Sequence, residues 1–273
     1  ADVIMKILFE SYSYATVILM RNLVAVLILA AYVIWRHGKG GFRTRHWLIH
    51  LTRGVLVVGL AYAGAYAFDL LPLSNAYVLI FSAPFWAVLM GRVFFGERLS
   101  RGHIIAIIGG FCGVCIAADI GHLVFNAGTL AALITALLFA ASSVSVRWIS
   151  RDESPILLGL YATVPIVFVT GFDAMPEGAA VMDANFKVLW LVLLMGMTSG
   201  IGAFLVGVGF QNAPTRIVAP LHYIQLLWGI LFDVTIWGIW PSWQTMLGGL
   251  IIVVAGLYLI RAEKGVIDET API

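Results

Sequence analysis

Apolar residues in this chain occur in runs of about twenty, the length that a helix needs to cross the hydrocarbon core of a bilayer. Charged or turn-forming residues separate the runs, and the strict alternation over about ten residues that is typical of membrane barrels does not occur. We assign spans to residues 14–35, 47–68, 73–95, 103–119, 127–146, 155–172, 187–209, 216–239 and 242–261. The pattern therefore predicts an all-α membrane protein.

The composition excludes several other classes of protein. Hydrophobic residues make up 62% of the 273 residues and charged residues 11%, whereas soluble domains average roughly 45–50% and ~25%. A formal net charge of +2 is too small for the basic surface on which nucleic-acid binding depends. We expect the partners of this chain to be the lipid bilayer and a small-molecule substrate, and no nucleic acid.

The segment before the first run is apolar but too short to cross a bilayer. It comprises residues 1–9, and the sequence shows no initiator Met. We expect it to be the end of a first helix that is partly absent. Together with the nine spans, this helix predicts a ten-helix bundle.

Basic residues at the ends of the spans predict the orientation. Twelve Lys and Arg side chains lie at span ends on one side, and Lys187 alone lies at an end on the other. Because cytoplasmic loops carry the excess of basic residues, the first side is cytoplasmic. The C-terminus lies on that side and is therefore expected in the cytoplasm.

An internal repeat appears when the sequence is compared with itself at an offset of 142 residues, and the span boundaries shift by the same amount. Five helices per half is an odd number, so the second half must enter the membrane from the opposite side. We predict two inverted repeats, residues 1–125 and 126–273, in one bundle. Secondary transporters bind their substrates near the midplane between such repeats. The matched pairs include Gly54 and Gly196, Phe68 and Phe210, Pro72 and Pro214, Trp86 and Trp228, and Gly96 and Gly238.

Several motifs of the first half resemble the EamA domain of the drug/metabolite transporter superfamily. They are the L-P-x-x-x-A loop at 71–76, Ala83-Pro84-Phe85, the G-E-x-x-x turn at 96–100 and the glycine-rich stretch at 109–114. The resemblance implies ten helices in two halves and transport of a small metabolite. The basic region with H-x-x-R-G at 50–54 is similar to a bacterial branch that carries riboflavin, S-adenosylmethionine and amino acids, which implies a bacterial inner membrane protein.

Charged residues within spans are candidates for function because each costs about 2.5–3.5 kcal/mol to insert. Asp2 and Lys6 share a helical face and form either a coupling site or an internal salt bridge. Arg21 cannot lose its proton, so it binds a substrate carboxylate or phosphate, an acidic residue or a lipid headgroup. Arg53, near a cytoplasmic end, is interpreted as a snorkelling anchor.

Aromatic residues and a proline mark span 73–95. Tyr77, Phe81 and Pro84 share a face, and Trp86 follows. Pro84 removes a backbone hydrogen bond and is expected to kink the helix as a gating element. We predict that Tyr77, Phe81 and Trp86 contact substrate, with packing between helices as the alternative. Tyr62 is a further substrate-contact candidate in span 47–68.

Polar residues occur in the repeat-equivalent span 216–239. His222, Gln225 and Trp228 recur every third residue and are predicted to bind a polar or aromatic solute, and His222 could also carry a proton. Pro220 is the gating candidate of this span. We expect Asp233, nearer the outer end, to be interfacial.

These patterns favour a secondary active or facilitative transporter of small polar metabolites that works by alternating access. An intramembrane serine hydrolase using Ser199 and His222, or a channel, is the alternative. The pair Cys112 and Cys115 supplies too few ligands for a structural metal, so we expect no metal and no cofactor. The protein is expected to be a monomer or a homodimer and not an enzyme.

Overall fold

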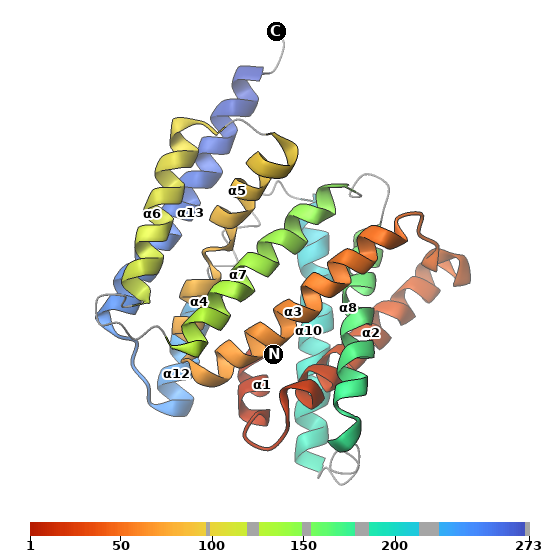
Figure 1. Ribbon diagram of the computed structural model, residues 1–273. Helices are drawn as coiled ribbons and strands as arrows, with labels where there is room; N and C mark the ends of the chain where they lie inside the picture. The colour runs from red at the N-terminus through yellow and green to blue at the C-terminus, as the bar shows by residue number, and fades with distance from the viewer. Residues whose placement is uncertain (97–98, 119–125, 149–153, 178–185, 213–223, 271–273) are drawn as a thin grey trace. The chain divides into compact units, whose positions relative to one another are not determined.

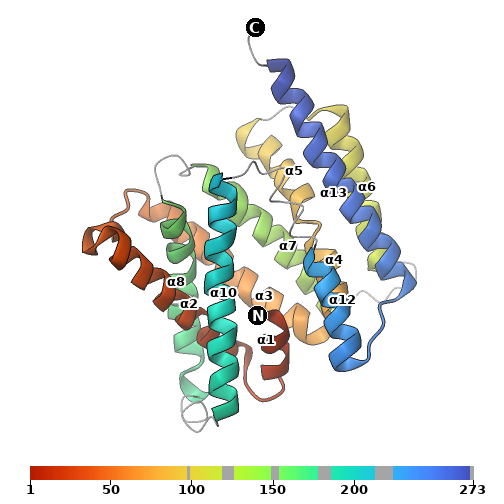
Figure 2. The ribbon, with the colours of Figure 1, turned by 180° about the vertical axis from the view of Figure 1, so that it is seen from behind.

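The computed structural model describes residues 1–96, 99–118, 126–148, 154–177, 186–212 and 224–270, and Figures 1 and 2 show it from opposite sides. All regular secondary structure in these ranges is helical. The longer helices are α1 (Asp2–Leu8), α2 (Tyr14–His37), α3 (Trp47–Leu70), α4 (Leu73–Ile80), α5 (Ala83–Phe95), α6 (Arg101–Ala117), α7 (Ala127–Ser145), α8 (Pro155–Asp173), α10 (Phe186–Asn212), α12 (Ile224–Trp237) and α13 (Trp243–Thr270).

The helices agree with the spans expected from the apolar runs. Stretches long and apolar enough to cross a membrane occur at 14–36, 47–70, 73–95, 127–145, 156–173 and 243–261. Shorter apolar helices occupy 101–117, 186–202 and 224–237. The prediction of an all-α membrane protein is thus confirmed.

Local sequence explains where several helices begin and end. Ser13 caps α2 by accepting a hydrogen bond from the backbone N–H of Thr16 at 3.3 Å. Ser100 and His103 form a reciprocal capping box at the start of α6. Helix α5 ends at Gly96, which has a φ of +67°, a left-handed conformation that glycine adopts without a steric penalty.

The chain folds into two compact units that each combine segments from both sequence halves. Unit 1 contains residues 1–69 and 145–212, and unit 2 contains residues 70–144 and 213–273. The predicted repeat boundary at 125–126 is therefore not the boundary between the units. Segments that are 142 positions apart in the sequence belong to the same unit.

Close helix contacts in unit 1 depend on two glycines. A Cβ atom on Gly54 of α3 would lie 2.5 Å from Cγ of Pro165 in α8, and one on Gly196 of α10 would lie 2.3 Å from Cβ of Val24 in α2. Glycine therefore permits both close approaches. Gly54 and Gly196 are equivalent at the offset of 142, and Pro165 and Val24 are equivalent to within one residue.

Unit 2 has a comparable glycine contact between α6 and α13, which lie side by side in both views (Figures 1 and 2). A Cβ atom on Gly113 would lie 2.9 Å from the carbonyl oxygen of Gly248, and one on Gly248 would lie 2.5 Å from that of Gly113. A separate core cluster joins α5 to α7 through Ala83, Ala136 and Ala140. Small side chains of this kind let membrane helices pack closely.

The span at 73–95 is interrupted, as the position of Pro84 predicts. Helix α4 ends at Ile80 and α5 begins at Ala83. Phe81 and Ser82 between them keep right-handed helical dihedrals, with ψ values of 0° and −12°. The interruption between α4 and α5 is therefore short.

Candidate functional site

An arginine inside unit 1 lies beside a close approach of α10 to α2. Gly196 and Gly200 of α10 both face α2, where a Cβ atom on Gly200 would lie 3.4 Å from Cα of Ala25. Ser199 lies between these glycines, and its hydroxyl reaches Arg21 of α2. The glycine spacing thus brings together two polar residues that are 178 positions apart in the sequence.

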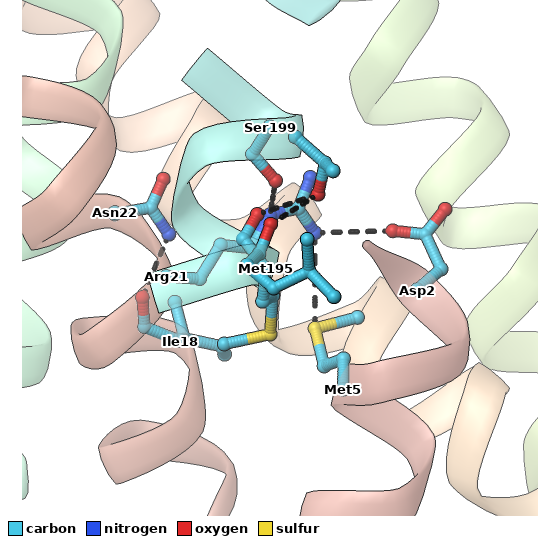
Figure 3. A network of polar contacts seen from close by, with 9 residues as sticks. Asp2, Met5, Ile18, Arg21, Asn22, Met195 and Ser199 are labelled. Carbon is cyan, nitrogen blue, oxygen red and sulfur yellow. Dashed lines mark hydrogen bonds and ion pairs between the residues drawn. The ribbon is translucent and has the colours of Figure 1, made fainter. Parts of the chain in front are cut away.

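Figure 3 shows the contacts of the Arg21 guanidinium. Its Nε donates a hydrogen bond to Oγ of Ser199 at 2.8 Å, and its Nη1 donates to Oδ1 of Asp2 at 3.3 Å. The same Nη1 lies 3.7 Å from the sulfur of Met5. We call Asp2, Met5, Arg21 and Ser199 the arginine network.

The charge of Arg21 in the arginine network is compensated by an acidic side chain, and its guanidinium is still partly exposed. Asp2 supplies the counter-charge that a guanidinium within a span requires. The side chains of Arg21 and Asp2 nevertheless remain 31% and 23% exposed. Because a guanidinium presents five N–H donors in a planar fork, this one is suited to bind a carboxylate or a phosphate.

Other polar side chains of unit 1 form bonds between its helices. Lys6 Nζ donates to the carbonyl oxygen of Phe68 at 2.6 Å, and the hydroxyl of Tyr62, a predicted substrate contact, donates to Asp173 at 2.7 Å. Tyr14 makes a similar bond with Asp69 at 2.6 Å. These contacts join α1 to α3, α3 to α8 and α2 to α3.

Arg53 is not the snorkelling anchor that its place near a span end suggests. Its side chain is only 6% exposed, and its Nη1 donates to the carbonyl oxygen of Leu158 in α8 at 3.2 Å. The contact of Gly54 with Pro165 brings α8 against this part of α3. Helix α8 therefore covers a side chain that the sequence alone places at the lipid surface.

The predicted aromatic contacts of unit 2 are largely buried. Tyr77 and Phe81 are 9% and 8% exposed, and their rings stack with centroids 6.1 Å apart. The Tyr77 ring also packs where a Cβ atom on Gly229 would come within 2.7 Å. Trp86 meets Phe111 edge-on at 4.8 Å, whereas Pro84 is exposed in the first turn of α5.

Asp233 is fully buried and is not the interfacial residue that its sequence position suggests. Its carboxylate accepts hydrogen bonds from the backbone N–H groups of Leu73 and Ser74 at 2.9 and 2.7 Å, and from the Ser74 hydroxyl at 2.6 Å. These N–H groups belong to the first turn of α4. Backbone N–H groups in the first turn of a helix have no acceptor within their own helix. Asp233 thus fixes α4 to α12.

The predicted polar face of α12 is only partly described. Gln225 and Trp228 are exposed, and Trp228 stacks on Phe232 at 5.9 Å. The two remaining candidates, Pro220 and His222, lie outside the described residues. The Ser199–His222 pair of the hydrolase alternative thus includes one residue outside the described part of the chain. The hydroxyl of the other, Ser199, accepts a hydrogen bond from Arg21.

Sequence reasoning missed Asn75, whose side chain lies on the same span as Ser82 and Trp86. These residues are spaced by seven and four positions, which places them on one face of a helix. This spacing was the available signal. Sequence reasoning also missed the role of Ser199 as a partner of Arg21, for which the sequence carries no comparable signal.

Comparison with known families gives a consistent match over nearly the whole chain. The model of the EamA-like transporter family matches residues 1–118 and 126–262. A solved crystal structure superimposes with a TM-score of 0.63 at 16% identity and covers 94% of both chains, which supports the fold alone.

Similar proteins of this length carry names of transporters. A riboflavin transporter of Brucella anthropi is 22% identical, covering 89% of this chain and 86% of the relative. An S-adenosylmethionine uptake transporter of Rickettsia bellii is 24% identical, covering 96% and 89%. A pseudopaline exporter of Pseudomonas aeruginosa is 25% identical, covering 92% and 87%.

Proposed function

The chain belongs to the EamA-like transporter family, and on this premise we propose that it moves a small polar metabolite across the bacterial inner membrane by alternating access. The proposed substrates are amino acids or solutes that resemble riboflavin or S-adenosylmethionine. The names of the bacterial relatives support this range of chemistry. The excess of basic residues at one set of span ends supports a cytoplasmic C-terminus.

The arginine network is the observation that carries this proposal. A charge within a span is costly and marks a substrate or ion path by default. Arg21 keeps 31% of its side chain exposed although Asp2 and Ser199 already bond to it. We propose that a substrate carboxylate binds the exposed part of this guanidinium.

Repeat-related packing supports the alternating-access part of the proposal. The contacts Gly54–Pro165 and Gly196–Val24 within unit 1 are related by the offset that defines the proposed repeats 1–125 and 126–273. Inverted repeats allow a transporter to adopt two equivalent states that open to opposite sides. Interrupted helices such as α4 and α5 occur in transporters where the helix lines a water-filled path.

The same contacts favour a transporter over an enzyme. Ser199, the nucleophile of the hydrolase alternative, accepts a hydrogen bond from the Arg21 Nε. A nucleophilic serine instead needs a base that removes its proton. We therefore propose no hydrolase role for Ser199.

We also propose that the protein is a monomer or a homodimer in the membrane.

Counterflow in reconstituted vesicles tests the proposed function. Vesicles containing the purified chain are loaded with unlabelled S-adenosylmethionine, riboflavin or an amino acid, and uptake of the same labelled solute is followed. We expect saturable uptake of at least one solute, with transient accumulation above equilibrium. Protein-free vesicles and vesicles with Arg21→Ala are the controls, and Arg21→Ala should lose uptake of a solute that carries a carboxylate.

Two results would contradict the proposal. Uptake that rises linearly with concentration and shows no counterflow would indicate a channel. No uptake of any of these solutes by folded wild-type protein would exclude the proposed substrate range.

A further inference from the structure

Three buried polar atoms in α4, in α5 and in the turn between them have no hydrogen-bond partner among the residues that the structure describes. They are Oδ1 of Asn75, Oγ of Ser82 and Nε1 of Trp86. Ser82 is completely buried. Buried polar groups in proteins are normally hydrogen-bonded, so three unpaired groups on one short stretch need an explanation.

The three groups lie within one short stretch of the span, with a spacing that an uninterrupted helix would place on one face. Spacings of seven and four residues would place their side chains within about 20° of a common direction at 100° per residue. Phe81 and Ser82 stay in the right-handed region through the interruption between the two helices. Asn75 and Trp86 are about 16 Å apart along the axis at ~1.5 Å per residue. We call Asn75, Ser82 and Trp86 the polar strip.

The described neighbours of Trp86 in the polar strip are apolar. Trp86 packs on Ala136 and Ala140 of α7 and meets the ring of Phe111. The sequence contains no charged residue from 73 to 90. The acidic side chain that contacts α4, Asp233, already accepts three hydrogen bonds from the start of that helix.

The chemistry of the polar strip therefore fits an uncharged ligand group. Asn75 offers an acceptor, Ser82 offers a donor or an acceptor, and Trp86 offers a donor. An ionised group would lack a counter-charge here and would be costly to bury. Apolar walls with a few placed polar groups are typical of small-molecule sites.

We propose that the polar strip binds the uncharged, hydrogen-bonding part of the transported solute, such as its amide, hydroxyl or ring-carbonyl groups. This inference rests on the proposed function and names the part of the substrate that unit 2 recognises.

Riboflavin is the probe because it is uncharged and rich in ring carbonyls and hydroxyls. The melting temperature of the detergent-purified chain is measured with and without riboflavin for wild type, Asn75→Leu, Ser82→Ala and Trp86→Phe. Without riboflavin, Ser82→Ala should melt at or above the wild-type temperature, because it loses no hydrogen bond, whereas Trp86→Phe should lose only the packing of the larger ring on Phe111. Riboflavin affinity should fall about 3- to 10-fold in each variant, the range expected for one neutral hydrogen bond.

Two matched controls come from the same unit. Ser74→Ala removes a hydroxyl that does have a partner, Asp233, so its melting temperature should fall. Trp240→Phe changes a tryptophan that is 77% exposed and should change neither stability nor riboflavin affinity.

The outcomes separate this inference from the proposed function. A lower melting temperature in Ser82→Ala would show that an ordered water or another partner satisfies the Ser82 hydroxyl, and would overturn the inference. Failure of riboflavin to stabilise the wild type, together with counterflow of another solute, would overturn the inference and leave transport intact. Loss of riboflavin affinity in the variants without counterflow of any solute would support the strip and contradict transport.

Discussion

The arginine network of unit 1 and the polar strip of unit 2 differ in how their polar groups are paired. Arg21 is charged, and the protein itself provides Asp2 and Ser199 as its partners. Asn75, Ser82 and Trp86 are uncharged, and the polar atoms named for them have no partner in the described part of the chain. The difference follows from the cost of burial. An unpaired neutral group costs about 1–3 kcal/mol, whereas an uncompensated buried charge costs several kcal/mol.

This comparison teaches that the two regions suit different kinds of chemical group. A guanidinium with its own counter-ion can exchange or share that partner with an incoming carboxylate without ever being unpaired. Unpaired neutral groups instead gain a hydrogen bond only when a ligand arrives. Removing a satisfied group should therefore destabilise the fold, whereas removing an unsatisfied one should not.

The largest effect is expected at Asp233, a satisfied carboxylate in the same unit as the polar strip. Asp233→Ala leaves two backbone N–H groups and the Ser74 hydroxyl without their acceptor, which should cost about 3–5 kcal/mol of unfolding free energy. Denaturant unfolding in detergent measures this loss. Thr235→Ala, an exposed change on the same helix, should stay within about 0.5 kcal/mol.

A loss of unfolding free energy below about 1 kcal/mol for Asp233→Ala would contradict the comparison. Unit 2 would then tolerate the removal of a polar group whether or not that group is hydrogen-bonded. Asp233→Asn keeps one acceptor oxygen and should give an intermediate loss.

An intermediate effect is expected at Gly196, which holds α10 against α2. Gly196→Ala places a Cβ atom where Val24 lies at 2.3 Å, so the helices must separate at a cost of about 1–3 kcal/mol. The shift should also weaken the bond between Arg21 and Ser199 and reduce uptake of solutes with a carboxylate. Unfolding and counterflow assays on the same protein measure both effects.

Gly202→Ala is the matched control for this substitution. A Cβ atom at Gly202 meets nothing within 4 Å, so stability should be unchanged or slightly higher, since alanine favours the helix. Equal losses in both variants would indicate a general helix effect and would remove the role of Gly196 in the arginine network.

The smallest stability effect is expected for the ion pair itself. A double-mutant cycle with Asp2→Ala and Arg21→Ala should give a coupling free energy of about 0.5–1.5 kcal/mol, because both side chains are partly exposed and solvent screens them. Thermal unfolding of the four proteins provides the values. A coupling free energy near zero would mean that Asp2 does not compensate the charge of Arg21. It would support an anionic ligand as the partner of Arg21.

Much of the fold could be predicted from local sequence. Runs of apolar residues predicted the helices, and Pro84 predicted the interruption between α4 and α5. The need of Arg21 for a counter-group followed from its permanent charge. These features depend on residues that are close in the sequence and on whether they suit a bilayer. One sequence is enough to judge both.

Contacts between distant segments could not be predicted in the same way. Ser199 is 178 residues from Arg21, and Asp233 is 160 residues from Leu73. Arg53 was expected at the lipid surface because nothing in its own span shows that α8 covers it. The orientation of the chain and the substrate roles of Tyr77, Phe81 and Trp228 stay predictions.

The most direct test of the account compares counterflow of S-adenosylmethionine, which carries a carboxylate, with counterflow of riboflavin, which is uncharged. The ratio of the two rates is measured for wild type, Arg21→Ala and Trp86→Phe. Arg21→Ala should lower the ratio about 10-fold or more, because a charge-assisted bond is lost, and Trp86→Phe should leave the ratio unchanged or raise it. A ratio that changes equally in both variants, or no counterflow of either solute, would contradict the account.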